Sequence, residues 1–180
     1  MKNSFTLVEH NPEWKYAYAI EAEKIKDILG AQLLEIHHIG STAIPGLIAK
    51  PIIDILVVVK DIKALDVFQK KFEAQEYKWE GEFGIKDRRF IRKLKPDIKD
   101  EKEADSIVHI HCFQLGSPDI TRHLAFRDYL LKNPDSVKQY AKLKQELLAS
   151  GISRDQYQDQ KAAFIKAIEQ TTLKKEKSKT

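Results

Sequence analysis

Hydrophobic residues recur along this chain at two spacings, which predict helices and strands in turn. Helical spacing first appears over residues 14–29, and this pattern ends at Gly30, a residue favoured just after a helix. Further amphipathic stretches predict helices over 62–72, 140–147 and 157–168. Their apolar positions are Ile62, Leu65, Phe68 and Phe72 in the first, Tyr140, Leu143 and Leu147 in the second, and Tyr157, Phe164, Ile165 and Ile168 in the third.

The starts of helices carry signals of their own. A capping side chain, a proline and an acid follow one another at Asn11-Pro12-Glu13, Ser117-Pro118-Asp119 and Asn133-Pro134-Asp135. The capping oxygen accepts from an unpaired backbone N–H, proline suits the first helical turn, and the acid faces the positive end of the helix dipole. Ser153 and Gln156 form a capping box. We therefore expect helices that begin just after these four positions.

Apolar and β-branched runs between the helices predict five strands. The run over 52–59 is almost unbroken, which is typical of a strand covered on both faces. The other runs span 33–39, 77–79, 88–94 and 107–113, whereas the charged, aperiodic stretch 95–105 predicts an exposed loop. This order of elements predicts an α+β fold: a mixed sheet with flanking helices and a helical C-terminal layer.

Composition agrees with one globular domain, at 180 residues with 42% hydrophobic and 32% charged positions. No apolar run approaches the ~18 residues of a membrane span, and the N-terminus lacks the apolar segment of a signal peptide, so we expect a cytoplasmic protein with no membrane partner. The net charge of +4 is mild. Much of it lies in residues 173–180, which predict a flexible basic tail after a single domain over 1–172.

The turn Gly40-Ser41-Thr42 follows the first predicted strand and opens a short helix. Glycine lets the backbone approach a ligand closely, the Ser41 hydroxyl can bind it, and free N–H groups at such a turn suit phosphate oxygens. Lys50 adds a positive charge nearby. Taken alone, the same residues also describe a tight turn with a helix cap.

Asp54 lies on the otherwise apolar second strand. A carboxylate there binds a metal ion, accepts hydrogen bonds, or costs several kcal/mol as an unpaired buried charge. A metal ligand and a structural acid are both consistent with its position. Because the acid follows a turn suited to phosphate, the combination points to a site for phosphate and metal.

Histidines and arginines supply the other candidates. His109 and His111 alternate with apolar residues, so both imidazoles lie on one face of their strand and can bind metal, act as a general base, or donate to phosphate. His38 precedes the turn and is either functional or structural. Five arginines could meet an anionic ligand: Arg88, Arg89, Arg92, Arg122 and Arg127. Arg89 and Arg122 are favoured. Arg127 either meets the ligand or forms a structural pair with Asp128, which would hold its helix to the sheet.

The segment HIGSTAIPGLIAKPIIDI, residues 38–55, resembles the signature of the GrpB family, a branch of the nucleotidyltransferase superfamily. RRF at 88–90, HIH at 109–111, GSP at 116–118 and RHLAFRDYL at 122–130 extend the resemblance over about 8–168. It implies a nucleotidyltransferase-like fold that binds a nucleoside triphosphate or another phosphorylated small molecule with a divalent metal. The family's domain also occurs joined to dephospho-coenzyme A kinase, which implies a link to coenzyme A biosynthesis.

Two positions depart from the superfamily pattern of two acids one residue apart and a third on a later strand. Leu56 stands at the second acid, and only His109 and His111 are candidates for the third. The expected catalytic and metal set, for Mg²⁺, Mn²⁺ or Zn²⁺, is therefore Asp54, His109 and His111. The expected substrate and phosphate contacts are Gly40, Ser41, Thr42, Lys50, Arg89, Arg122 and His38. A metal-dependent nucleotidyltransferase, a non-catalytic nucleotide-sensing or interaction module, and an RNA-binding protein all remain open.

Overall fold

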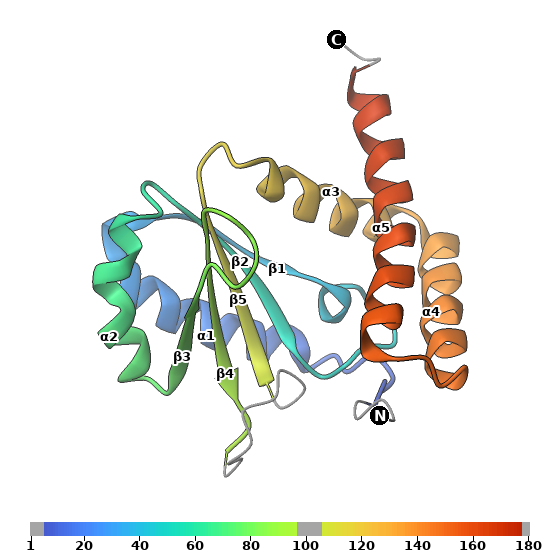
Figure 1. The fold of residues 1–180 in the computed structure, drawn as a ribbon, viewed down its shortest axis with the longest axis horizontal. Helices are drawn as coiled ribbons and strands as arrows, with labels where there is room; N and C mark the ends of the chain where they lie inside the picture. Colours follow the sequence, from blue (N-terminus) through green and yellow to red (C-terminus); the bar gives the residue numbers. More distant parts are fainter. Residues whose placement is uncertain (1–5, 97–105, 178–180) are drawn as a thin grey trace.

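The computed structural model describes residues 6–96 and 106–177 (Figure 1). Within them one mixed sheet has the strand order β1-β2-β5-β4-β3, in which β2 and β5 run parallel and the other neighbours antiparallel. All five predicted strands are present with bounds within two residues of the prediction. They are β1 (Leu33–Ile39), β2 (Ile53–Val59), β3 (Tyr77–Gly81), β4 (Arg88–Leu94) and β5 (Ser106–Gln114).

Helices surround this sheet in the predicted order, which confirms the α+β fold with a helical C-terminal layer. Most of the loop predicted over 95–105 lies outside the described residues. The last helix continues through Lys177, into the segment predicted as a tail. The helices are α1 (Trp14–Leu29), α2 (Gln69–Glu73), α3 (Pro118–Lys132), α4 (Pro134–Ala149) and α5 (Arg154–Lys177), with 3-10 turns η1 (Gly30–Gln32), η2 (Ser41–Ala43) and η3 (Ala64–Phe68).

The helix predicted over 62–72 is instead the 3-10 turn η3 followed by the short α2. Asp61 accounts for the difference, because its Oδ1 accepts from the backbone N–H groups of Lys63 and Ala64 at 2.8 and 3.3 Å. This side chain tightens the first turn into hydrogen bonds of the 3-10 type, such as Asp66 N to Lys63 O at 3.3 Å.

Three of the four predicted helix starts have the expected side-chain bond, and one does not. Asn11 Oδ1 accepts from the backbone N–H of Glu13 at 3.0 Å. Ser117 accepts from the backbone N–H at position 119, and Ser153 and Gln156 exchange the two bonds of a capping box. Asn133 makes no such bond, because its amide nitrogen donates to the Tyr129 carbonyl at 2.7 Å. The Asn133 side chain therefore caps the C-terminal end of α3 instead of the start of α4, although α4 begins at Pro134 as predicted.

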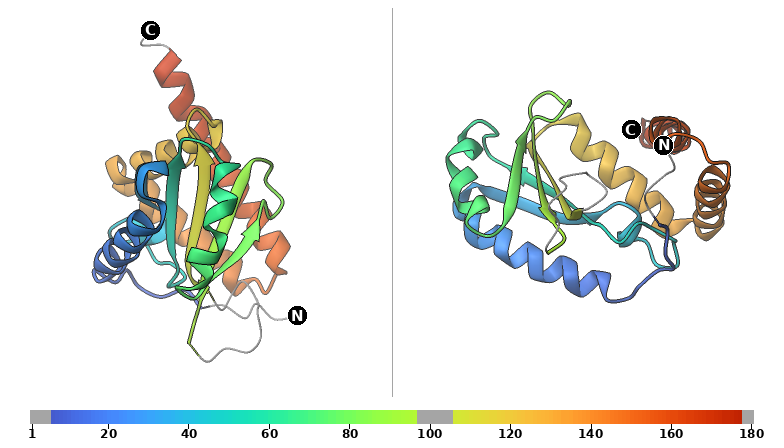
Figure 2. Two further views of the ribbon diagram at one scale, coloured as in Figure 1. Left: turned by 90° about the vertical axis from the view of Figure 1, so that its left-hand side faces the viewer. Right: turned by 60° about the horizontal axis from the view of Figure 1, so that its bottom comes forward.

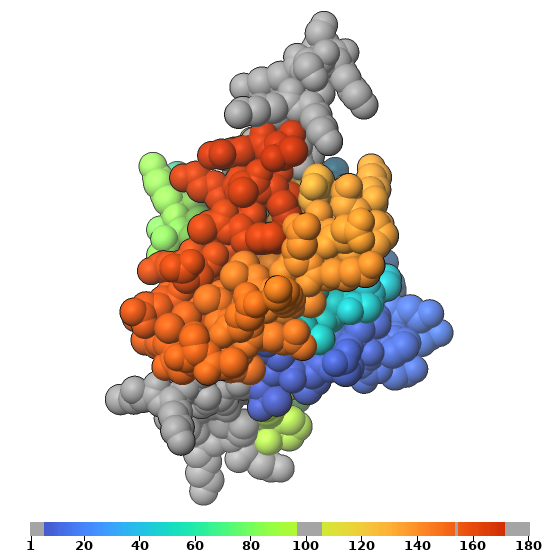
Figure 3. Space-filling model, turned by 90° about the vertical axis from the view of Figure 1, so that its right-hand side faces the viewer, coloured from blue at the N-terminus to red at the C-terminus, as the bar shows by residue number. Residues whose placement is uncertain are grey.

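The two faces of the sheet are covered differently (Figure 2). On one face α1 and α2 bury the apolar residues of β2, β4 and β5, including Ile55, Val57 and Ile110. On the other face α3 covers Leu56 and Phe113. Next to α3, α4 and α5 pack around a separate apolar cluster and cover one side of the molecule (Figure 3). The face that α3 covers also carries the even-numbered side chains of β2, among them Asp54.

Candidate metal and phosphate site

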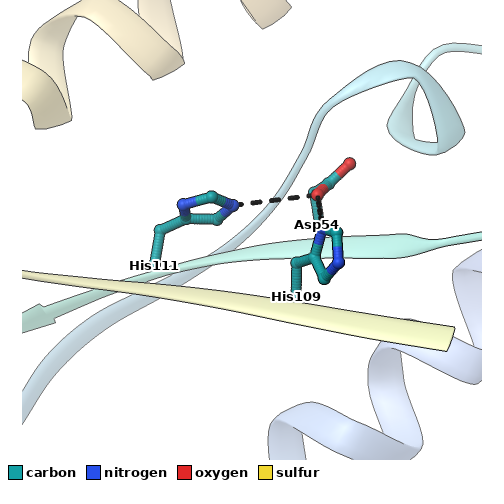
Figure 4. Close-up of side chains that lie close together, drawn as sticks. All are labelled: Asp54, His109 and His111. Carbon is teal, nitrogen blue, oxygen red and sulfur yellow. Dashed lines mark ion pairs between the residues drawn. The ribbon is translucent and has the colours of Figure 1, made fainter. Parts of the chain in front are cut away.

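Asp54, His109 and His111 meet on the α3 side of the sheet (Figure 4). The parallel register pairs Asp54 with His109, and His111 lies two residues further along the same face of β5. Asp54 Oδ1 lies 3.4 Å from His109 Nδ1 and 3.7 Å from His111 Nε2. One ligand atom of each residue lies within 4.8 Å of the others. The structure thus brings together the three residues that the sequence predicts as a set.

Burial and hydrogen bonding act in opposite directions on these groups. Burial opposes ionisation of Asp54, but the hydrogen bonds and charges of His109 and His111 outweigh it, so the pKa of this carboxyl lies well below its ordinary value. Burial lowers the pKa of His111 against the opposing effect of the carboxylate. An ionised carboxylate therefore lies beside an imidazole that burial shifts towards its neutral form, which is the form that binds metal.

Gly40 is the backbone position that makes room for the Asp54 carboxylate. Its φ of 70° and ψ of −172° lie in a region that is essentially restricted to glycine. A Cβ atom here would lie 3.0 Å from Asp54 Cβ and Cγ and closer still to Oδ2. The sequence predicts that Gly40 lets the backbone approach a ligand closely. In the structure, the group that lies against Gly40 is the Asp54 side chain.

His38 and Thr42 form the framework of the turn. The His38 ring stacks on Tyr18 at a centroid distance of 4.8 Å, and its Nε2 lies 3.0 Å from Thr42 Oγ1. Thr42 Oγ1 in turn donates to the Ile52 carbonyl at 3.2 Å. Burial lowers the pKa of His38 to about 4, so it is neutral at physiological pH. Of the two interpretations of His38, the geometry favours the structural one.

Lys144 enters the site from α4 and was not predicted from the sequence. Its side chain is 2% exposed, and its Nζ donates to Ser41 Oγ at 3.1 Å and to the Ile48 carbonyl. Burial, together with the nearby charge of Lys161, lowers the pKa of Lys144 to about 7. One signal could have revealed it: Lys144 stands four residues after Tyr140 on the apolar stripe of its helix, where a lysine is unexpected.

A cavity of about 360 Å³ connects these groups. Its walls come from η2, β2, β4 and β5 on one side and from α4 and α5 on the other. The predicted contacts Ser41, Thr42 and Lys50 lie in it, and so does Asp54. The side chains that line it with a positive charge are Lys50, Arg88, Lys144 and Lys161.

Arg89 and Arg122, two of the predicted phosphate contacts, lie away from the cavity. Arg89 alternates with Arg88 along β4 and points to the opposite face of the sheet from Asp54, where it pairs with Asp66. Arg122 pairs with two acids on the helices, Asp119 at 2.8 Å and Glu169 at 3.6 Å. Neither lines the cavity. The neighbouring Arg88 does, at 6% exposure.

Of the two roles open to Arg127, its contacts favour the structural one. It pairs with Asp128 at 2.7 Å and donates to the His38 carbonyl at 3.3 Å, which links α3 to β1.

The arrangement of the sheet and its helices is similar to that of another solved structure. A structure of Cid1, described as an RNA terminal uridylyl transferase, superposes with a TM-score of 0.50 at 15% identity, covering 73% of this chain and 38% of that one. At this identity the likeness concerns the fold alone. Among the described residues, no helix is both long enough and apolar enough to cross a membrane.

The chain belongs to the GrpB family, whose model "GrpB protein" matches residues 4–171. A crystal structure of the conserved protein GrpB from Enterococcus faecalis superposes with a TM-score of 0.84 at 41% identity over 94% of this chain and 98% of that one. UPF0157 protein YqkA of Bacillus subtilis is 37% identical over 99% of this chain. The chain spans half the length of YqkA. A dephospho-CoA kinase of Mycolicibacterium paratuberculosis is 34% identical over 39% of this chain, which is 18% of that protein.

Proposed function

We propose that this protein binds a divalent metal ion together with a phosphorylated ligand, a nucleoside triphosphate in the first instance, in the cavity around Asp54. The observation that carries the proposal is the set of Asp54, His109 and His111 in a cavity ringed by cations. An ionised acid and imidazoles attract a metal, and the cations attract a polyanion.

The donor set fits a particular kind of metal. Two imidazoles and one carboxylate favour Mn²⁺ or Zn²⁺, whereas Mg²⁺ favours oxygen ligands. Leu56 is fully buried against the α3 side and offers no second carboxylate. His109 faces Asp54 through Nδ1, at 3.4 Å from the carboxylate, and this is the ring atom that a metal between the two side chains would use. Bound there, the metal would neutralise charge on phosphate oxygens.

Lys144 is the residue that most directly supports the binding of phosphate. Of its three N–H groups, two have acceptors in the protein, Ser41 Oγ and the Ile48 carbonyl. With a pKa of about 7, it gains a full charge when an anion binds beside it. Lys50, Lys161 and Arg88 extend the positive wall. Four cationic side chains around one cavity match the charge of several phosphate groups better than that of a single phosphate group.

Transfer of a nucleotidyl group is the reaction that this fold suggests, by analogy alone. It would proceed by in-line displacement, with positioning and charge neutralisation as the main sources of catalysis. With one carboxylate instead of three, the site holds a pair of metal ions poorly. Metal-dependent ligand binding is therefore the function that the geometry supports best, and catalysis is the second candidate.

One contact favours a different role for His111. Arg88 Nη1 lies 3.4 Å from His111 Nδ1, and because a guanidinium only donates, this contact favours the tautomer with its proton on Nε2. Nε2 is the atom that faces Asp54. In that tautomer His111 donates to an oxygen, of the carboxylate or of a phosphate, and does not bind metal. Metal ligation and phosphate donation by His111 are thus separable alternatives.

Calorimetric titration of the purified chain tests the proposal. Nucleoside triphosphates, dephospho-coenzyme A and coenzyme A are each titrated with Mn²⁺, Zn²⁺ and Mg²⁺, and thermal unfolding is followed in parallel. Ligand at a hundredfold excess over Kd should stabilise the fold by ~2.7 kcal/mol. Asp54→Asn should abolish the metal-dependent part of binding, and Ser41→Ala should weaken phosphate binding in a chain that still folds. If no ligand binds with any of the metals, the proposal is wrong.

The same titrations from pH 5.5 to 8, with His109→Gln and His111→Gln, assign the histidines. Ligation of metal predicts an affinity that falls as the pH drops through ~6.5 and below, because protons compete for the imidazoles. Donation to phosphate by charged imidazoles predicts the opposite slope. A third outcome, in which RNA binds with a steep dependence on salt and nucleotides do not, would favour the RNA-binding alternative.

A further inference from the structure

An aromatic side chain stands exposed at the edge of the proposed site. Phe83 lies between β3 and β4, lines the cavity together with Asp54 and is 48% exposed. Its backbone has a φ of 45°, in the left-handed region. A bulky residue there is an outlier, and folding alone favours glycine, which occupies the next position. Such outliers concentrate at ligand sites, where the surrounding structure holds them in place.

Arg88 fixes the Phe83 backbone. Its Nη2 donates to the Phe83 carbonyl at 2.6 Å, and its Nε donates to the Glu82 carbonyl at 3.2 Å. The Phe83 ring lies against the Phe90 ring at 5.1 Å between centroids and 26° between planes. Hydrogen bonds on its backbone and a stacked ring on one side therefore hold Phe83 rigidly, although nearly half of its surface is exposed.

Phe90 connects this ring to the metal-binding set. It is 2% exposed, and its centroid lies 5.2 Å from the ring of His109 and 5.2 Å from the ring of His111. A row of contacting rings thus runs from the histidines, through the buried ring of Phe90, to the exposed ring of Phe83. A ligand whose phosphates lie by Asp54 would meet this row at its exposed end, the ring of Phe83.

We infer that Phe83 stacks against a planar ring of the ligand. The ligand is accordingly a nucleotide, which carries a nucleobase as well as phosphates, and not a bare polyphosphate or a phosphorylated aliphatic compound. This inference rests on the proposed function and names the substrate class of the same site. Stacking on an aromatic side chain tolerates every base, because each base has a π face. Phe83 therefore favours ligands that carry a nucleobase but does not discriminate between one base and another.

The test compares nucleoside triphosphates with inorganic tripolyphosphate, which has the phosphate chain but no ring. Affinities of ATP, UTP and tripolyphosphate are measured with Mn²⁺ by calorimetry for the full chain and for Phe83→Ala. Stacking of one base corresponds to about five- to a hundredfold in affinity. Phe83→Ala should weaken ATP and UTP by that factor and leave tripolyphosphate unchanged.

Two further variants control the comparison. Tyr16→Ala removes an aromatic ring of similar exposure, 54%, from α1 on the other side of the sheet, and it should alter none of the three affinities. Phe83→Trp should restore nucleotide binding. The emission of the new indole should be quenched by ATP and UTP but not by tripolyphosphate, an effect that a purely structural role would not produce.

Each remaining outcome has a distinct meaning. If Phe83→Ala weakens all three ligands equally, or none of them, the stacking role is wrong while the proposed function stands. If the unaltered chain binds tripolyphosphate as tightly as ATP and UTP, the ligand carries no recognised ring and the inference is also wrong. If it binds none of the three, a nucleoside triphosphate is not the ligand of the proposed site, and the inference fails with it.

Discussion

Replacing Gly40 with alanine is the smallest change that should disturb the Asp54 carboxylate without touching it chemically. The new methyl group would lie 3.0 Å from two carbon atoms of Asp54 and closer to Oδ2. Ordinary carbon contacts lie at ~3.5–4.0 Å, so the carboxylate has to move by about half an ångström or more. Functional groups must be held within ~0.5 Å of their productive geometry, so a shift of this size is enough to spoil a metal ligand.

Two separate effects can be expected from Gly40→Ala. The backbone conformation, unsuited to any residue but glycine, costs ~1–3 kcal/mol of folding free energy. Displacement of the Asp54 carboxylate should lower metal affinity by ~10–100-fold, the range seen when groups that orient metal ligands are removed. Gly46→Ala provides a matched control, because Gly46 has a similar φ of 76° but no atom within 4 Å of the added methyl group.

Urea unfolding and Mn²⁺ titration of both variants separate these effects. Gly40→Ala and Gly46→Ala should each lose stability, the second by ~1–2 kcal/mol. Metal affinity should fall only in Gly40→Ala. If Gly40→Ala, when folded, binds Mn²⁺ as tightly as the unaltered chain, then the close fit between Gly40 and Asp54 does not position a ligand.

The remaining predictions concern charged residues. Because burial lowers the pKa of Lys144 from 10.5 to about 7, the unfolded chain binds more protons between these values, and the free energy of unfolding should rise with pH over this window, which urea unfolding can follow. Lys144→Met should flatten that rise and be more stable than the unaltered chain at pH 6, with a gap that closes towards pH 10. Bound phosphate should favour the charged lysine, so ligand affinity should fall as the pH rises above about 7, and calorimetry should find no such fall in Lys144→Met. Arg89→Gln should leave ligand affinity unchanged and cost less than ~1 kcal/mol, because its partner Asp66 is largely exposed; a weakened affinity would place Arg89 in the site after all.

Periodicity was a sound guide to the elements, because the sheet here has a strongly apolar face. The run over 52–59 and the alternation over 107–113 identify β2 and β5, and alternation also places His109 and His111 together. The distinction between a 3-10 turn and a helix over 62–72 depends on one side chain, Asp61, and on hydrogen bonds that periodicity does not report.

Site residues that depend on strand register or on the packing of distant elements were harder to predict from the sequence. Arg88 and Arg89 are neighbours in sequence, and which of them faces Asp54 depends on strand register, where a slip of one residue reverses every side chain. Lys144 reaches Ser41 across 103 positions, because α4 packs beside η2 in three dimensions. Local pattern carries no information about that packing. The role of Phe83 likewise depends on a backbone conformation that the sequence does not reveal.

The central claim is that Asp54, with the histidines beside it, holds a divalent metal ion. Electron paramagnetic resonance of free Mn²⁺ measures this directly, in titrations of the unaltered chain and of Asp54→Asn at pH 7.5, each with and without ATP. The account predicts that the unaltered chain removes free Mn²⁺ up to one equivalent, more tightly when ATP is present, and that Asp54→Asn leaves the free signal as it is in buffer with the same ATP. Identical binding curves for the two chains would contradict it.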